Sequence, residues 1–290
     1  MDNSVYHSHT PSISREPTKC YLDYEPEPEP EHENKKNYID YNTVITFDTK
    51  ENLKVTLYKN EHYIKNSFIN RKYWDINTLN RLEEYIDPNK NILELGGHCG
   101  TSSLIYSRYT NKKVYVYEPQ YNMFKLLQLN INQNNLSDKI IPINKGVFCY
   151  EGTINMSGKE NGRLLDIHSN KPVNYGGVSL GNDGEETEVT TIDRMDHIDI
   201  GFIHCDTQGA ENFIFSNGIN TITKYRPVIY FEDNANSKNK SDVKLYQNIC
   251  DKYPQYKKES QFSIEDFCLN KLNYSECIHN FNGIDHLLIP

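Results

Sequence analysis

Short apolar runs in this chain are separated by segments in which apolar residues recur every three or four positions. The runs have the length and β-branched content of strands that are buried on both faces. They cover residues 91–95, 113–118, 139–147, 188–192, 200–206, 227–232 and 286–289. The segments between them have helical spacing, and they cover residues 75–86, 119–129, 212–219 and 241–252. Strands that alternate with helices predict an α/β fold with a doubly wound, mostly parallel, Rossmann-like sheet.

The segment before residue 91 predicts an addition to this core. Residues 43–47 and 53–58 are rich in β-forming residues and are separated by a polar turn, which favours a hairpin. The helix at 75–86 has Asp75 as its expected N-cap, and it ends before Pro88. We therefore expect a hairpin-and-helix addition at 38–90 and the main domain at 91–290.

Two further segments lack regular periodicity. Residues 1–37 are poor in apolar residues and alternate Glu with Pro over 25–31, which predicts a disordered acidic tail. Residues 151–186 are rich in Gly, Asn and charged residues. This second segment is either a substrate-facing insertion or a solvent-exposed loop.

Composition narrows the classes of partner. The 290 residues carry a net charge of −9, so no overall basic field attracts nucleic acid or anionic lipid. No run of about 18 apolar residues predicts a membrane span, and the N-terminus lacks the pattern of a secretory signal. We expect a soluble, cytoplasmic protein. The seven cysteines are scattered without a C-x-x-C pair, which predicts reduced thiols.

A glycine-rich turn follows the strand at 91–95. Gly96, Gly97 and Gly100 separate this strand from a helix. Glycine allows a tight turn and a close approach to a ligand, while the first turn of a helix offers unpaired N–H groups. Glu118 ends the next strand, 24 residues after Glu94, which is close to the spacing of an acid that binds a ribose diol.

The glycine pattern favours S-adenosylmethionine over NAD as the cofactor. The order here is G-G-x-x-G, whereas the dinucleotide fingerprint is G-x-G-x-x-G. Glu94, two residues before the first glycine, would repel a pyrophosphate and could pair with the ammonium group of S-adenosylmethionine. A glycine turn without any ligand is the alternative.

Acids also end later strands. Asp206 and Glu232 close the strands at 200–206 and 227–232, and the carboxyl ends of parallel strands share one crevice with Glu94 and Glu118. Asp206 and Glu232, with Glu211 or Asp233, could instead hold Mg²⁺, although we do not expect a metal. His98-Cys99 and His204-Cys205 do not complete a zinc pattern.

Together these motifs resemble the FkbM family of S-adenosylmethionine-dependent methyltransferases. The similarity covers about residues 75–290 and includes Glu94–Gly100, the Glu118-Pro119 strand end, Asp206–Glu211, and Arg226-Pro227 with Glu232. It implies a class I methyltransferase fold and acceptors such as hydroxyl groups of sugars and polyketide-like products. His204 stands where the family usually has Lys, and Gln208 replaces the commoner Glu.

These observations lead to one set of roles. The expected cofactor-binding residues are Glu94, Gly96, Gly97, His98, Gly100, Glu118 and Pro119. The expected catalytic residues, which orient or deprotonate the acceptor, are Asp206, His204 and Glu211. His204 could also be an ordinary core histidine, and Glu211 could stabilise a helix dipole.

The expected function is O-methylation of a small-molecule hydroxyl, on a sugar or glycan. Two alternatives stay open: an RNA methyltransferase, disfavoured by the acidic composition, and a catalytically silent cofactor-binding module. The sequence leaves the acceptor, the methylated position and the oligomeric state undetermined.

Overall fold

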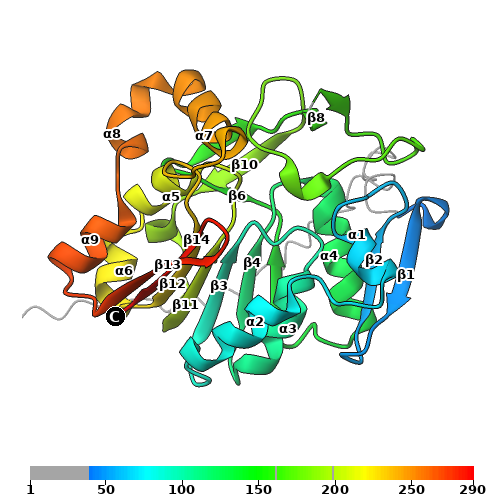
Figure 1. Ribbon diagram of the computed structural model, residues 1–290, viewed down its shortest axis with the longest axis horizontal. Coiled ribbons are helices and arrows are strands. Elements are labelled where there is room, and N and C mark those ends of the chain that lie inside the picture. Colours follow the sequence, from blue (N-terminus) through cyan, green and yellow to red (C-terminus); the bar gives the residue numbers. More distant parts are fainter. Residues whose placement is uncertain (1–38, 161, 198) are drawn as a thin grey trace, which may run out of the picture. The chain divides into compact units, whose positions relative to one another are not determined.

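The computed structural model describes residues 39–160, 162–197 and 199–290, so the predicted tail at 1–37 lies outside it. The core of the described part is a seven-stranded sheet with the order β13-β14-β12-β11-β3-β4-β5 (Figure 1). Its strands are β3 Asn91–Leu95, β4 Val114–Tyr117, β5 Ile140–Ile143, β11 Ile200–Cys205, β12 Val228–Glu232, β13 Glu276–Asn282 and β14 Asp285–Ile289. The strands from β12 to β5 are parallel to one another. β14 is antiparallel to both of its neighbours, β12 and β13, so β13 runs in the same direction as the parallel strands. The predicted α/β, mostly parallel sheet is confirmed.

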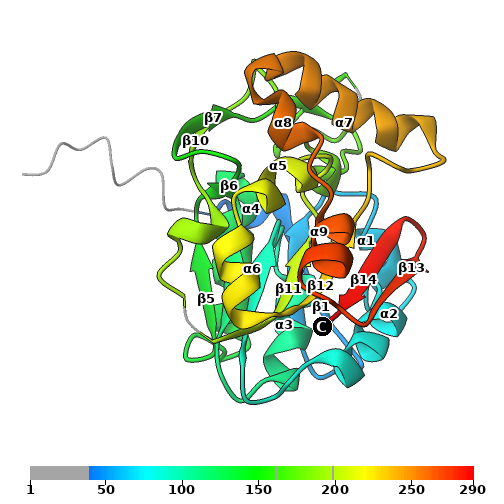
Figure 2. The ribbon, with the colours of Figure 1, turned by 90° about the vertical axis from the view of Figure 1, so that its left-hand side faces the viewer.

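Side chains alternate between the two faces of this sheet, as strand geometry requires. On β3, Ile92 contributes to one hydrophobic core, and Leu93 and Leu95 contribute to the other. The first core includes residues of α2 (Ile76–Leu82), α3 (Thr101–Tyr109) and α4 (Tyr121–Gln133). The second includes residues of α5 (Glu211–Ser216), α6 (Ile219–Tyr225), α7 (Lys240–Lys252) and α9 (Ile264–Lys271), of which α6 and α9 lie in front in Figure 2. Two short helices, α1 (Lys65–Ile69) and α8 (Lys257–Ser260), complete the set of described α-helices.

The direction in which strands are added to the sheet reverses at β3. β4 and β5 lie on one side of β3, and β11 and β12 lie on the other. The loops after β3 and β11 therefore touch: the Asp206 N–H donates to the Leu95 carbonyl at 3.1 Å. A Cβ on Gly96 would lie 1.9 Å from the Asp206 carbonyl oxygen, and the φ of Gly96 is +89°, so this position requires glycine. Such a reversal is where open α/β sheets bind ligands.

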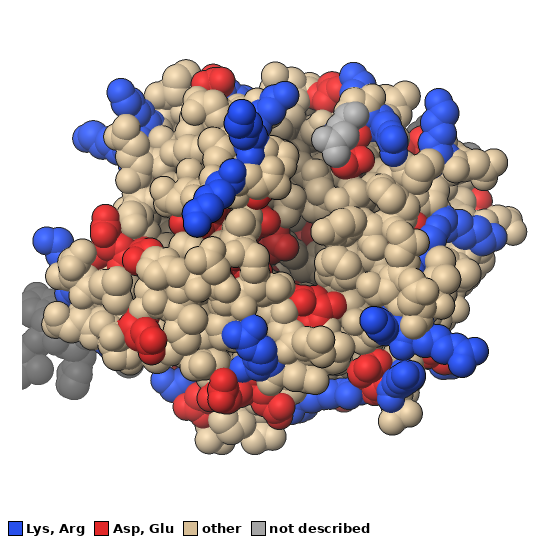
Figure 3. All heavy atoms as spheres, in the orientation of Figure 1, with Lys and Arg blue, Asp and Glu red and all other residues tan. Residues whose placement is uncertain are grey.

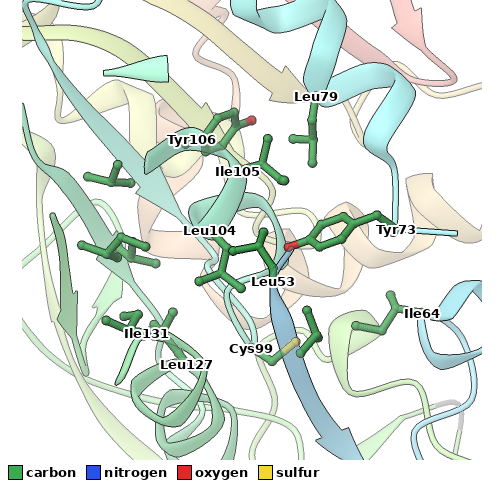
Figure 4. Close-up of a cluster of buried hydrophobic side chains, with 14 of the residues drawn as sticks. Leu53, Ile64, Tyr73, Leu79, Cys99, Leu104, Ile105, Tyr106, Leu127 and Ile131 are labelled. Carbon is green, nitrogen blue, oxygen red and sulfur yellow. The ribbon is translucent and has the colours of Figure 1, made fainter. Parts of the chain in front are cut away.

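The predicted N-terminal hairpin is present as β1 (Val44–Asp48) and β2 (Lys54–Tyr58), which pair antiparallel. It is fixed to α4 by Asn130, whose side chain accepts from the Thr56 N–H and donates to the Thr56 carbonyl. Figure 4 shows Leu53, Ile64 and Tyr73 of this segment beside side chains of α3 and α4. The addition therefore shares the first core with the main domain.

Several predicted helix ends are wrong. α2 stops at Leu82 and a 3₁₀ turn follows at Glu83–Tyr85. Asp75 is at the N-cap position with φ +49°, but its side chain accepts from the Thr78 hydroxyl and makes no cap bond. α4 begins at Tyr121 instead of Pro119.

Two other predicted elements are divided. The helix predicted at 212–219 is split at Asn217-Gly218 into α5 and α6. The strand predicted at 139–147 becomes β5 and a separate β6 (Gly146–Val147).

The segment expected to be an irregular insertion contains regular structure. β6, β10 (Glu186–Thr190) and β7 (Gly152–Asn155) form a three-stranded sheet in the order β6-β10-β7. β8 (Lys159–Glu160) and β9 (Arg163–Leu164) pair antiparallel. The strand predicted at 188–192 thus belongs to this small sheet, because its partners are β6 and β7.

The described cysteines agree with the predicted reduced state, since all six are free, and four of them are buried. In the described residues, no helix is both long and apolar enough to span a bilayer.

Candidate active site

A cavity of about 1050 Å³ opens at the carboxyl ends of β3, β4, β11 and β12. Its walls come from the glycine turn, the strand ends, the N-terminal addition, the 151–186 segment and the C-terminal hairpin. Figure 3 shows carboxylate atoms inside the central hollow, with most Lys and Arg side chains around its periphery. Acidic side chains outnumber basic ones in the lining. The seven acids are Glu51, Asp75, Glu118, Asp206, Glu232, Asp242 and Asp285, and the three basic residues are Lys50, Arg71 and Lys72.

Glu118 forms one end of this cavity, directly after β4. Its Oε2 accepts from the His98 N–H and its Oε1 accepts from the Gln120 N–H, both at 2.7 Å. The first of these bonds joins the glycine turn to the end of the second strand. Glu118 is 2% exposed, and each carboxylate oxygen keeps a further lone pair. In its ionised form this side chain can therefore accept two more hydrogen bonds from a ligand.

Burial raises the pKa of Glu118 to about 8, although the two backbone hydrogen bonds lower it. The carboxyl group is thus predominantly protonated near neutral pH. A ligand that donates hydrogen bonds to the carboxylate would favour the ionised form.

Glu94 does not line the cavity, which corrects the expectation that it points into the crevice. It lies on the face of β3 that Ile92 also occupies, and it is fully buried. Its Oε2 accepts from the Ser103 hydroxyl of α3, and its Oε1 lies 3.4 Å from Nδ1 of His204 on β11. The parallel register that pairs Glu94 with His204 brings these two side chains together.

His204 is placed between Glu94 and the cavity. Its side chain is 12% exposed, it lines the cavity, and its ring stacks on Tyr230 of the neighbouring β12 with centroids 5.1 Å apart. Burial lowers the pKa of His204, but the Glu94 carboxylate, with Asp206 and Asp285, outweighs burial and raises it above the usual value. This ring is therefore a more basic group than an isolated histidine.

Asp206, Glu232 and Asp285 form an acidic wall beside His204. The Gln208 amide donates to Asp206 at 2.7 Å and to Glu232 at 3.3 Å. Burial, with Asp206 and Glu211, raises the pKa of Glu232. Burial also raises the pKa of Asp285 to about 7, and Asp285 accepts from the Tyr230 hydroxyl.

The Mg²⁺ alternative finds little support in this arrangement. An amide donor bridges Asp206 and Glu232, and neither belongs to a group of three metal-ligating side chains in the described part of the chain.

Glu211 and Gly100 lie outside the cavity wall. One Glu211 oxygen accepts from the Thr207 N–H at 2.9 Å, the Thr207 hydroxyl at 2.8 Å and the Gly209 N–H at 3.3 Å. It therefore fixes the loop that carries Asp206. Gly100 has φ +89°, and a Cβ there would lie 2.6 Å from Leu127 Cδ1, so this glycine allows α3 to pack against α4.

The sequence reasoning missed the walls that come from distant segments. Tyr73, Trp74 and Asp75 line the cavity from the N-terminal addition, and Asp285 lines it from the C-terminal hairpin. The one feature of the sequence that could have pointed to these walls was Trp74, the single tryptophan of the chain. Residues 174 and 176–178 also line the cavity, as the substrate-facing interpretation of the 151–186 segment requires.

The sheet order, the glycine turn and the acid at the end of the second strand define a class I S-adenosylmethionine-dependent methyltransferase. The profile of the family described as the methyltransferase FkbM domain matches residues 91–256, more than half of the chain. The chain belongs to this family. No curated protein matches it.

Similar solved structures include methyltransferase FkbM from Methylobacillus flagellatus KT, with 14% identity, a TM-score of 0.42, and coverage of 69% of this chain and 43% of that one. A putative caffeoyl-CoA O-methyltransferase from Staphylococcus aureus has 13% identity, a TM-score of 0.44, and coverage of 78% and 90%. The Pyrococcus abyssi tRNA (uracil-54, C5)-methyltransferase, in complex with S-adenosyl-L-homocysteine, has 10% identity, a TM-score of 0.39, and coverage of 85% and 43%. The chain thus spans less than half the length of the first and third of these proteins.

The residues present fit the cofactor of this class. Glu118 is a buried carboxyl group that faces the cavity with unused acceptor capacity, and the tightly packed Gly96-Gly97 turn leaves the adjoining space open. Hydroxyl donors of a ribose are suited to that acceptor.

Proposed function

We propose that this protein transfers the methyl group of S-adenosylmethionine to a hydroxyl oxygen of a small molecule, on a sugar or glycan. The observation that carries the proposal is that two sets of side chains with different chemistry line the same cavity. Glu118 and the turn at Gly96–His98 line one part of it, and His204 with Asp206, Glu232 and Asp285 lines another. An alcohol needs a hydrogen-bond acceptor or base near its oxygen, and this wall supplies several.

In this proposal, Glu118 accepts hydrogen bonds from the ribose hydroxyls, and Gly96, Gly97, His98 and Pro119 shape the adjoining wall. The bound cofactor supplies an electrophilic methyl group. The protein's part is to align the acceptor oxygen with that methyl group, since much of the rate of such a displacement comes from positioning. Asp206, which is exposed to the cavity, accepts a hydrogen bond from the acceptor.

His204 is the proposed base. Its neutral form takes the hydroxyl proton, and Glu94 stabilises the imidazolium that results, because its carboxylate lies 3.4 Å from Nδ1. Glu94 is therefore a positioning residue for His204 instead of a direct ligand of the cofactor. Glu211 is also a positioning residue, because it holds the 207–209 loop.

The rim of the cavity supports a sugar acceptor. Tyr63 and Trp74 line it with their ring centroids 5.1 Å apart, and such aromatic surfaces combine an apolar face with a polar tip. Lys50, Arg71 and Lys72 on the same N-terminal segment could bind an anionic substituent. A nucleic acid would instead require a continuous basic surface, whereas acids outnumber cations in this lining.

The test is a radiolabelled methyl-transfer screen over sugars, sugar phosphates, nucleotide sugars and RNA, with and without Mg²⁺. We expect transfer to a sugar-containing acceptor, with an O-methyl group identified by mass spectrometry of the product. Transfer to RNA alone would overturn the proposal. Tight cofactor binding without transfer to any acceptor would favour the silent module.

A further inference from the structure

Four potential metal ligands meet where α9 packs against the C-terminal hairpin, away from the cavity described above. Glu265 of α9, Cys277 and His279 of β13, and His286 of β14 each offer one ligand atom. These four atoms all lie within 4.8 Å of one another. None of the four residues lines the cavity that contains Glu118 and His204.

The strand register brings these residues together. Cys277 pairs with Leu288 and Ile278 with Leu287. The rings of His279 and His286, the next residues on the two strands, have centroids 4.7 Å apart. Residues two apart on a strand share one face, so Cys277 and His279 lie on the same side. α9 packs against β13 and brings Glu265 to this side from its first turn.

The polar atoms of the cluster are incompletely paired. His286 Nδ1 is buried and has no hydrogen-bond partner. It lies 3.8 Å from Asp233 and 3.9 Å from Glu265, beyond hydrogen-bonding distance. His279 Nε2 lies 3.2 Å from Glu265. Buried polar groups are almost always satisfied, and the ligand atoms of Cys277, His279 and Glu265 all lie within 4.8 Å of that of His286, so a ligand shared by the four side chains would satisfy this imidazole.

We propose that Glu265, Cys277, His279 and His286 bind one structural Zn²⁺ ion. One thiolate, two imidazoles and one carboxylate are the donors that tetrahedral zinc prefers, whereas Mg²⁺ and Ca²⁺ select oxygen donors alone. The thiolate and the carboxylate together neutralise the charge of the ion. Zinc bonds of about 2.0–2.3 Å require these donors to move inward by roughly 1 Å. The side chains of Glu265 and His279, which are 29% and 50% exposed, are free enough to do so.

The proposed ion would act on the active site through the hairpin turn. Gly283 and Ile284 line both the main cavity and the smaller pocket beside His279 and His286, and the next residue, Asp285, belongs to the acidic wall. A zinc ion between α9 and both strands would fix this turn. Its role is therefore to position the acidic wall.

Metal binding by the full-length, tag-free protein tests this proposal. After treatment with a chelator, the protein is titrated with Co²⁺, and a thiolate-to-cobalt charge-transfer band is recorded and then displaced by Zn²⁺. We expect about one equivalent of metal per chain and a higher melting temperature with Zn²⁺. Elemental analysis after gel filtration measures the retained zinc.

Matched cysteine variants assign the ligands. Cys277→Ser should abolish the charge-transfer band and weaken zinc binding at least about tenfold. Cys250→Ser, which removes another partly buried thiol on α7, should leave both unchanged. Should Cys277→Ser fail to fold, His279→Gln on the more exposed side of the site keeps the thiolate and should weaken zinc binding at least about tenfold. Substoichiometric zinc that gel filtration removes, an unchanged band in Cys277→Ser, or an unchanged zinc affinity in His279→Gln would overturn the proposal.

Discussion

The ionisation of Glu118 gives the sharpest test of the cofactor assignment. Burial raises the pKa of this carboxyl group to about 8 in the ligand-free protein, so it carries a proton at neutral pH. If the ribose hydroxyls donate hydrogen bonds to the carboxylate, binding favours the ionised form and releases that proton. Affinity for S-adenosylmethionine should then rise with pH and level off above about 8.

The size of the effect follows from linkage. If the pKa in the complex falls to the ordinary range, the association constant rises almost tenfold for each pH unit below the free pKa. We therefore expect nearly tenfold tighter binding at about pH 7 than at about pH 6. Isothermal titration calorimetry in buffers of different ionisation enthalpy measures the affinity and the released proton together.

Glu118→Gln removes the titrating group. The neutral amide also replaces the charged acceptor that the ribose hydroxyls would meet, and a hydrogen bond to a charged group contributes ~1.5–3 kcal/mol. Binding above pH 8 should weaken by about 10- to 150-fold, and the proton release assigned to Glu118 should disappear. Glu186→Gln is the matched control, because Glu186 is an exposed acid on β10 that does not line the cavity.

The folded state of the ligand-free protein supplies an independent check. Because the folded pKa of Glu118 exceeds the unfolded value of 4.5, its stabilising contribution is fully present below about pH 4.5 and is lost as the pH rises through about 8. Glu118→Gln should flatten this part of the stability curve. Binding by the wild type that does not depend on pH, or equal proton release by wild type and Glu118→Gln, would refute the assignment of Glu118 to the ribose.

Three other substitutions test the remaining assignments. Glu94→Gln should move the pH–rate midpoint downward, because the carboxylate that raises the pKa of His204 is gone; an unchanged midpoint would argue against His204 as the base. Asp206→Asn should lower turnover by about 10- to 150-fold, because a hydrogen bond to a charged group contributes ~1.5–3 kcal/mol, and it should preserve cofactor affinity; a parallel loss of both in rate assays and calorimetry would contradict its placement at the acceptor. Gly97→Ala should lower the free energy of unfolding by ~1–3 kcal/mol, because its Cβ would lie 2.0 Å from Val116 Cγ1; denaturant melting checks this, and wild-type stability would show that the turn can relax.

Local patterns were sufficient to predict the central motif. The apolar run at 91–95, the following glycines and the acid at 118 have fixed chain spacings, and the structure joins them through the hydrogen bond from the His98 N–H to Glu118. Strand alternation likewise predicted that His204 and Asp206 could face one side. Both line the cavity.

The position of Glu94 could not be predicted in this way. Its strand is buried on both faces, so an acid at the fourth residue of that strand could face either a ligand or the core. The parallel register with β11 decided the outcome, because it placed His204 beside Glu94.

The sequence alone therefore determined the α/β class, the order of strands and helices, the glycine turn and the acid that faces it, because each depends on residues close together in the chain. Only the tertiary structure decided which distant residues complete the cavity, namely Trp74, Asp75 and Asp285, and it also decided that four ligands from α9, β13 and β14 meet. Those juxtapositions depend on strand register and helix packing between segments up to about 200 residues apart. No spacing along the chain encodes such contacts.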